Sequence, residues 1–177
     1  IGISMPNFWL GLLLLLWFGL RLDLLPMWGM GKISKGLWDY VSHLILPSIT
    51  LGTALAGLLT RLTRSSFLDK LTDDYVYTAR AKGLKERVVL YKHVLRNAII
   101  PVISMGGLQF GALLGGSMIV ETIFAWPGMG RLAINAIQKR DFPVLQGTTL
   151  IFAASLMVTL LLVDIVNSII DPAIRYD

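Results

Sequence analysis

The sequence predicts an all-α protein whose helices cross a lipid bilayer several times. Hydrophobic residues make up 55% of the chain and charged residues only 15%. The mean hydropathy is +0.69, which is too apolar for an ordinary soluble domain of 177 residues. The apolar residues gather in four segments, each near the roughly twenty residues that a membrane-spanning helix needs. We therefore expect a single polytopic membrane domain, residues 1–177, with about four membrane helices.

The four expected spans cover residues 6–22, 44–62, 99–124 and 148–170. The loop after the first span, residues 23–43, holds Trp28, Trp38 and Tyr40, which suit a membrane interface. The loop before the last span, residues 125–146, breaks sharply at Trp126-Pro127-Gly128 and continues in a short helix-like run over 131–139. Asp171-Pro172 is expected to end the last helix.

The cations are concentrated between the second and third spans. Nine of the sixteen Lys and Arg residues lie between Arg61 and Arg96. The positive-inside rule places this window in the cytoplasm and the other two loops outside. An even number of spans then puts both ends of the chain inside. The net charge of +5 therefore indicates topology, and nucleic-acid binding is excluded as a function.

The cytoplasmic segment, residues 73–98, is predicted to form two helices around a glycine. Thr72 is expected to cap the first helix, which runs from about residue 73 to 82 with Asp73 and Asp74 in its first turn. Gly83 is expected to end that helix, and a second helical run over 85–98 leads to Pro101. The residues alone fit two roles: docking of another protein, or an amphipathic element lying on anionic lipid.

The sequence disfavours the main alternative classes. It contains no GxxxxGK(S/T) phosphate loop, so an ATPase site is not expected in this chain. The sequence also shows no Ser-His or paired-carboxylate arrangement across facing helices, so an intramembrane enzyme is not expected. An ion-coupled carrier working alone would leave the cytoplasmic segment unexplained. His43 and His93 fall on opposite sides of the membrane and cysteine is absent from the sequence, so we expect neither a metal site nor a cofactor.

The cytoplasmic segment resembles the coupling loop of binding-protein-dependent ABC importer permeases. The run YVYTARAKG at 75–83, followed by HVLRNAIIP ending at Pro101, is similar to the EAA-type loop of the peptide-importer branch. Tyr77, Thr78 and Ala79 stand where the general pattern has Glu-Ala-Ala, so the acidic member is absent. The distance from Gly83 to Pro101 is longer than in the general pattern and fits the dipeptide and oligopeptide branch. Further matches are SMPNFWLG (4–11), RLTRSS (61–66), VETIFAWPGMGRL (120–132), RDFPVLQG (140–147) and DPAIRY (171–176).

This resemblance implies a pore-forming permease of the type I, MetI-like importer fold in a bacterial or archaeal inner (plasma) membrane. Such subunits have six helices, so this chain, which starts at Ile1 without an initiator Met, is expected to be the C-terminal part of one. The implied partners are a second homologous permease, two ATPase subunits, an extracytoplasmic substrate-binding protein and the lipid bilayer. The implied substrates are dipeptides or short oligopeptides, with glutathione or nickel complexes as the alternatives.

The resemblance also implies which residues meet the ATPase. Ala79, Ala81 and Gly83 are expected to make the closest contacts, with Arg80 and Lys82 beside them. The full set of expected coupling residues is Tyr75, Thr78, Ala79, Arg80, Ala81, Lys82, Gly83 and Leu84.

The third span carries glycines at four-residue spacing, at Gly107, Gly111 and Gly115. This spacing places them on one helix face, which is typical of close helix packing, and we favour packing over a substrate-lining role without excluding that both hold. The polar candidates for contact with a transported peptide on the same span are Ser104, Gln109 and Ser117.

Carboxylates near the membrane invite a functional interpretation. Glu121 is expected to lie near the outer interface, solvated or anchoring the outer loop. Asp164, with Asn167 one turn on, is expected to bond a neighbouring helix or a cation, and a proton relay through a single carboxylate is disfavoured. The outer loop would either meet the binding protein or close the passage. The spacing of its residues does not distinguish these two roles. Its candidate residues are Trp126, Pro127, Gly128, Arg131, Arg140 and Asp141.

Overall fold

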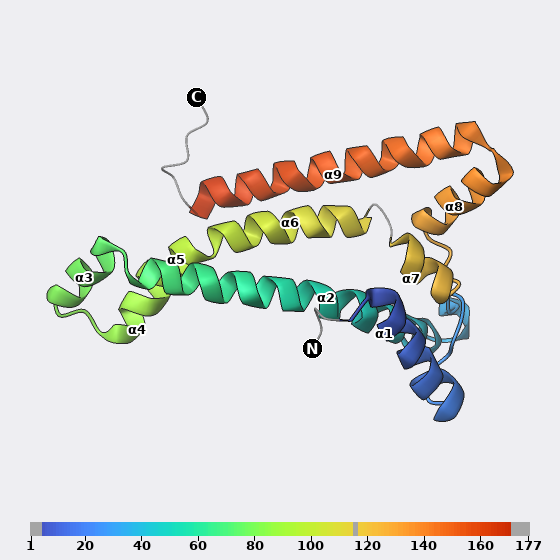
Figure 1. Cartoon of the computed structure of the whole chain (residues 1–177), viewed down its shortest axis with the longest axis horizontal. Coiled ribbons are helices and arrows are strands. Elements are labelled where there is room, and N and C mark those ends of the chain that lie inside the picture. Colours follow the sequence, from blue (N-terminus) through green and yellow to red (C-terminus); the bar gives the residue numbers. More distant parts are fainter. Residues whose placement is uncertain (1–4, 115–116, 171–177) are drawn as a thin grey trace. The chain divides into compact units, whose positions relative to one another are not determined.

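The computed structural model of the chain describes residues 5–114 and 117–170 (Figure 1). These residues form helices joined by turns, with no strand among them, which confirms the all-α class. The chain divides into two compact units. The first unit comprises Ile1–Gly57 and Ala112–Leu156, and the second comprises Leu58–Gly111 and Met157–Asp177.

The first unit begins with α1 (Asn7–Leu14), which continues as a π-helix, η1 (Leu15–Arg21). A short 3-10 turn, η2 (Ile33–Lys35), precedes α2 (Leu37–Leu71), whose first part belongs here. The unit then resumes with α7 (Met118–Ile123), α8 (Met129–Lys139) and the first part of α9 (Phe142–Ile170). Its buried core joins η1, α2 and α7 through Leu15, Leu46, Val120 and the residue after α7, Phe124.

The second unit holds the end of α2, followed by α3 (Asp74–Ala81) and α4 (Glu86–Val88). A π-helix, η3 (Val89–Val94), and α5 (Leu95–Ala98) then lead into α6 (Ile100–Leu114). The end of α9 completes this unit. Its core is formed by Val76, Ala79, Val89 and Val94, so it lies inside the predicted cytoplasmic segment.

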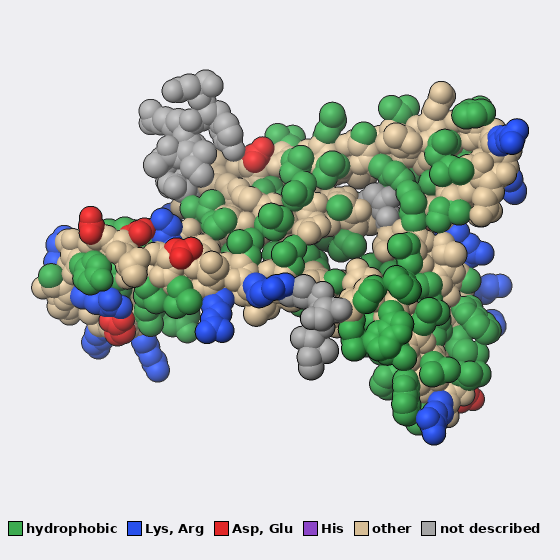
Figure 2. Space-filling view, viewed as in Figure 1, with side chains coloured by type: hydrophobic (Ala, Val, Ile, Leu, Met, Phe, Trp, Pro, Cys, Tyr) green, Lys and Arg blue, Asp and Glu red, His purple; other side chains and the backbone are tan. Residues whose placement is uncertain are grey.

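Three of the four expected spans have the length and composition to cross a membrane: Leu37–Leu71, Ile100–Ile123 and Phe142–Ile170. The helix at the first expected span, Asn7–Arg21, is shorter than predicted. It falls below the roughly twenty residues that a spanning helix needs. Large apolar side chains such as Leu150, Met157 and Leu161 are exposed along α9, and Figure 2 shows hydrophobic side chains covering this helix. Such exposure is expected of helices that face lipid or other membrane helices.

Several predicted boundaries were wrong. Helix α2 starts at Leu37 rather than at residue 44, and it continues through Pro47. Helix α9 starts at Phe142 rather than at 148, where the Asp141 carboxylate accepts a hydrogen bond from the Val144 amide at 3.2 Å and so caps the helix. The third span is described as two helices, α6 and α7, and Ser117 precedes α7 instead of lying within a helix.

Candidate functional site

The predicted helix–glycine–helix corner is present. Helix α3 ends at Ala81, and Gly83 has a φ of +73°, a left-handed conformation that glycine adopts without strain. The Gly83 amide donates to the Arg80 carbonyl at 2.9 Å, and the Leu84 amide donates to the Ala79 carbonyl at 3.4 Å. These bonds close the end of α3 and turn the chain toward α4.

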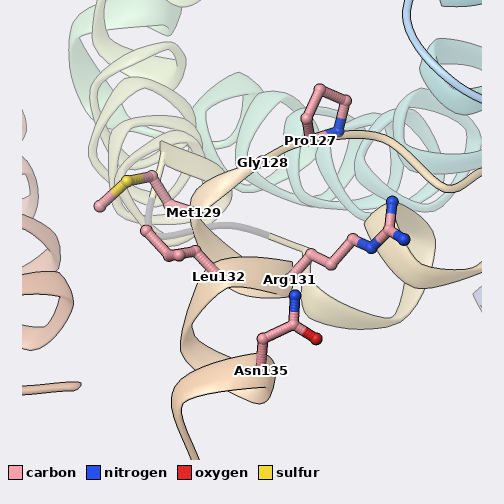
Figure 3. Close-up of a pocket in the computed structure, with 6 residues that line it drawn as sticks. All are labelled: Pro127, Gly128, Met129, Arg131, Leu132 and Asn135. Carbon is pink, nitrogen blue, oxygen red and sulfur yellow. The ribbon is translucent and has the colours of Figure 1, made fainter. Parts of the chain in front are cut away.

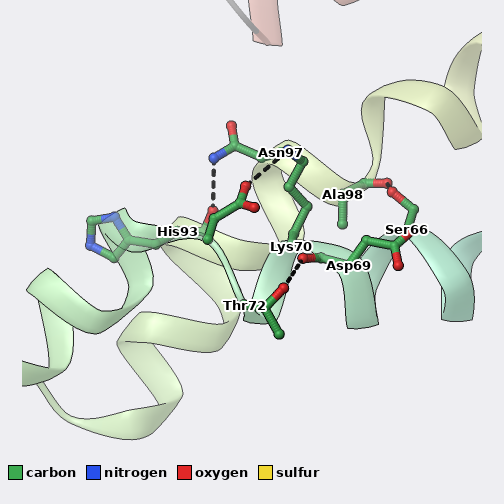
Figure 4. A network of polar contacts seen from close by, with 8 residues as sticks. Ser66, Asp69, Lys70, Thr72, His93, Asn97 and Ala98 are labelled. Atoms are coloured by element: carbon green, nitrogen blue, oxygen red, sulfur yellow. Dashed lines mark hydrogen bonds and ion pairs between the residues drawn. The ribbon is translucent and has the colours of Figure 1, made fainter.

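The predicted cap of α3 was wrong by one residue. Asp73, not Thr72, occupies the N-cap position, with extended φ and ψ of −71° and 144°. The Thr72 hydroxyl instead donates back to the Asp69 carbonyl at 2.9 Å, at the end of α2. The Asp73 carboxylate pairs with the Lys70 ammonium at 2.9 Å. The end of α2 and the start of α3 are therefore joined by side chains of adjacent turns (Figure 4).

The inner side of the segment is a small apolar core. Val76 and Ala79 of α3 pack with Val89 and Val94 of η3, and side chains such as Tyr75 cover this cluster. Ala79 is only 6% exposed. The Ala79 side chain therefore faces the segment's own core, and the close contact expected between residue 79 and another protein stays a prediction.

The outer side of the corner is exposed. Tyr77 is 58% exposed and Leu84 41% exposed, and a β-carbon added to Gly83 would meet nothing within 4 Å. We call the exposed residues at this corner the corner surface. They are Tyr77, Thr78, Arg80, Ala81, Lys82, Gly83 and Leu84. Figure 2 shows Lys, Arg, Asp and Glu side chains gathered around α3 and α4.

An ion pair spans the glycine corner. The Arg80 guanidinium donates to both Glu86 carboxylate oxygens, at 2.7 and 3.3 Å. This hydrogen bond lowers the pKa of Glu86 and raises that of Arg80. The sequence interpretation missed Glu86, although opposite charges on the two sides of a predicted glycine turn were a usable signal.

Two hydrogen bonds within the second unit join the predicted cytoplasmic segment to membrane helices. The Ser66 hydroxyl of α2 donates to the Ala98 carbonyl at 2.8 Å (Figure 4). The Arg96 Nε donates to the carbonyl of Ile170, the last residue of α9, at 3.2 Å. Neither contact was predictable from local sequence patterns, because both join residues far apart in the chain.

The predicted glycine face is partly a packing surface. A β-carbon at Gly107 would overlap the Val163 side chain of α9, and Gly111 is buried. Gly115 lies outside the described residues. Ser104 bonds helix neighbours, because its hydroxyl donates to the Ile100 carbonyl at 3.1 Å and accepts from Asn167 Nδ2 at 2.8 Å. Gln109 is half-buried on the same helix.

The outer-loop candidates lie in the first unit. The Glu121 carboxylate accepts a hydrogen bond from the Arg131 amide at 2.8 Å, and the Arg131 guanidinium donates to the Ala125 carbonyl at 2.8 Å. A β-carbon at Gly128 would overlap the Glu121 carboxyl group, so only glycine leaves room for this arrangement. The centroids of the Trp126 and Tyr40 rings lie 6.3 Å apart. Glu121 thus holds the turn before α8 in place.

A cavity of about 400 Å³ opens beside this turn (Figure 3). The expected residues Pro127, Gly128 and Arg131 line it. Three residues of α8 that the sequence interpretation did not single out also line it: Met129, Leu132 and Asn135.

The two histidines were expected to be structural. Among the described residues, neither belongs to a group of side chains that could hold a metal ion. His43 Nδ1 lies 2.7 Å from the Asp39 carbonyl, and the His93 carbonyl accepts from Asn97 (Figure 4).

These features define a class: a polytopic helical membrane protein with a preformed helix–glycine–helix unit between two of its membrane helices. Residues 1–176 match the family described as the inner membrane component of binding-protein-dependent transport systems. The chain belongs to this family, and it is a multi-pass component of the inner membrane.

The chain is also similar to bacterial transport proteins of known name. It is 50% identical over 175 residues to the glutathione transport system permease protein GsiC of Pectobacterium atrosepticum, and equally so to those of Escherichia coli and Salmonella choleraesuis. These matches cover 99% of this chain and 55% of each relative. The chain therefore spans little more than half the length of these relatives.

Proposed function

We propose that this chain is part of the pore-forming subunit of an ATP-driven importer of short peptides, and that residues 73–98 receive the motion of an ATPase partner. For a chain of this family, the proposal rests on one structural observation. The corner surface is presented by α3 and the turn that follows it, and the inner side of α3 is packed against η3 by a core. A rigid unit of this kind can be pushed by a partner without losing its shape.

The chemistry of the corner surface suits a protein partner. Tyr77, Ala81 and Leu84 offer exposed apolar area, and Lys82 lies next to them in the chain. Aromatic anchors with a charged rim are typical of energetically important contacts between proteins. The expected partner surface is an apolar groove with acidic residues at its edge. Because the sequence holds no phosphate loop, the energy of ATP would enter through this contact.

The proposed substrate class follows the relatives. Their printed name is glutathione transport permease, and glutathione is itself a tripeptide. We therefore propose glutathione as the first substrate to test, followed by dipeptides, short oligopeptides and nickel complexes. The partners in this proposal are a second permease, two ATPase subunits and an extracytoplasmic binding protein.

The test is co-purification of the ATPase with the complete subunit that carries this sequence. A Gly83→Asp change should reduce the recovered ATPase at least fivefold, because it places a carboxylate in the corner surface at a position with open space around it. Gly83→Asn is the matched control, since asparagine has nearly the same size and tolerates the left-handed conformation equally well. We expect Gly83→Asn to retain most of the ATPase. If the wild type recovers no ATPase, or if both variants bind it normally, the proposed coupling role is wrong.

A further inference from the structure

The end of α9 is held to neighbouring helices along one face. Val163, Asn167 and Ile170 are spaced four and three residues apart, so they share one side of the helix. Each takes part in a contact with α5 or α6. These contacts lie within the second unit and connect the cytoplasmic segment to membrane-embedded helices.

The first contact is at the cytoplasmic end of α9. Arg96 in α5 donates through Nε to the Ile170 carbonyl at 3.2 Å. The last carbonyls of a helix have no partner within the helix, and that end carries a partial negative charge. A guanidinium group is therefore well matched to this position, and the bond joins the coupling segment directly to the last membrane helix.

The second contact lies one turn farther into α9. Asn167 is 6% exposed, and its Nδ2 donates to the Ser104 hydroxyl of α6 at 2.8 Å. Its Oδ1 is buried and accepts no hydrogen bond from the described residues. A buried amide with one unpaired oxygen adds little net stability, because the desolvation cost offsets the single bond. The arrangement is better suited to fixing position than to adding stability.

The third contact is the packing of Gly107 on Val163. A β-carbon at Gly107 would overlap the valine side chain, so the Val163 side chain packs directly on the glycine of α6. Van der Waals contact at this point and a hydrogen bond at Ser104 restrain α6 and the end of α9 against sliding past one another. Arg96 then extends the same restrained body to the coupling segment.

We infer that Arg96 and Asn167 are positioning residues that make the coupling segment, α6 and the end of α9 move as one body. In the importer proposed above, on which this inference rests, they would convert displacement of the segment into displacement of two membrane helices. Without them the ATPase would still bind and hydrolyse ATP, but its motion would be lost between the segment and the membrane.

The test is transport per ATP hydrolysed by the complete importer in proteoliposomes, with labelled glutathione as the probe. Arg96→Ala and Asn167→Ala should each lower the number of molecules imported per ATP at least fivefold while ATPase binding and hydrolysis stay within twofold of wild type. Arg87→Ala, which removes an exposed cation of the same segment, should leave the ratio unchanged. The double variant S104N/N167S exchanges the two polar residues. Its number of molecules imported per ATP should lie between those of Asn167→Ala and wild type.

A second readout follows the geometry without transport. Spin labels at Tyr91→Cys and Ile169→Cys, both exposed positions, should report one narrow distance that is the same with and without trapped ATP. Arg96→Ala should broaden this distribution. A distance that changes with nucleotide in the wild type overturns the inference. So does a parallel loss of hydrolysis and transport in Arg96→Ala. If the wild type binds no ATPase, the proposed function fails instead, and the spin-label distance in the isolated subunit still tests the restrained body.

Discussion

Gly107 shows how a single missing side chain sets the distance between two membrane helices. In lipid, helices associate through close packing more than through the hydrophobic effect, so small residues gather where they touch. The overlap that a β-carbon at Gly107 would make with Val163 places this residue in that role. Gly52, in the interior of α2, is the opposite case, because a β-carbon there would meet nothing within 4 Å.

Gly107→Ala should destabilise the subunit by about 1–3 kcal/mol, because the added methyl group overpacks the contact with Val163. Gly52→Ala should be neutral or stabilising by up to about 1 kcal/mol, since alanine favours the helix and has space. Thermal unfolding of the purified subunit in detergent measures both. Equal melting temperatures for the two variants would contradict the packing role.

Residue roles were predictable from the sequence where one local property decides them. Gly83 was expected at a corner because glycine ends helices, and its φ of +73° agrees. The burial of the Ala79 side chain was not predicted, since the sequence does not reveal that η3 packs on α3 and covers it. Arg96 and Asn167 gained meaning only through partners 74 and 63 residues away in the chain.

At the scale of elements, the segment of residues 73–98 combines a buried apolar core with an exposed ion pair across its corner. The Arg80–Glu86 pair is solvent-accessible on both sides, so its contribution is small and sensitive to salt. Its value is geometric, because it links the first residue of α4 to the end of α3 across the glycine corner.

The ion pair makes the order of the corner depend on pH. Bonding to Arg80 lowers the pKa of Glu86 below its value in the unfolded chain, about 4.3. The contribution is therefore fully present above that value and is lost as the pH falls through the lower, folded-state pKa. Hydrogen exchange of residues 80–86, corrected for intrinsic rates, should show up to about threefold more opening at pH 3.5 than at pH 6.

Glu86→Gln is the control for this pH effect. The variant should show the more open corner at pH 6 already, and it should lose most of the pH dependence. A wild-type corner whose opening is the same at both pH values would show that the pair contributes nothing measurable.

Helix type was harder to predict than helix existence. The sequence indicated the run after Gly83, but a 3.6-residue period does not distinguish the π-helical turns of η3 or η1 from α-helix. The start of α2 was misjudged because Trp38, Asp39 and His43 look like loop residues at a membrane interface. Within the helix, the Ser42 and His43 side chains both contact the Asp39 carbonyl, which satisfies their polar groups locally.

At the scale of the whole molecule, the fold class and the membrane location were predictable because hydropathy and charge act over many residues at once. The family and the inner-membrane location agree with the sequence. The number of long helices was overestimated by one among the described residues, since the apolar run at 6–22 forms a helix of limited length.

The predicted topology can be tested directly, because the sequence has no cysteine. A Lys82→Cys variant should react with a membrane-impermeant maleimide only after cells are permeabilised. An Asn135→Cys variant, exposed on α8, should react in spheroplasts without permeabilisation. The cysteine-free chain is the control, and the reverse labelling pattern would invert the assigned topology.

The length of α2 has a further consequence for residues 73–98. Its 35 residues extend about 52 Å at a rise of roughly 1.5 Å per residue, whereas a bilayer with its headgroups is about 40–45 Å thick. In the predicted topology, a helix of that length crosses the membrane and extends beyond the headgroups on the side where α3 begins. The corner surface would then lie in the aqueous phase beyond the headgroups, where a soluble partner can reach it.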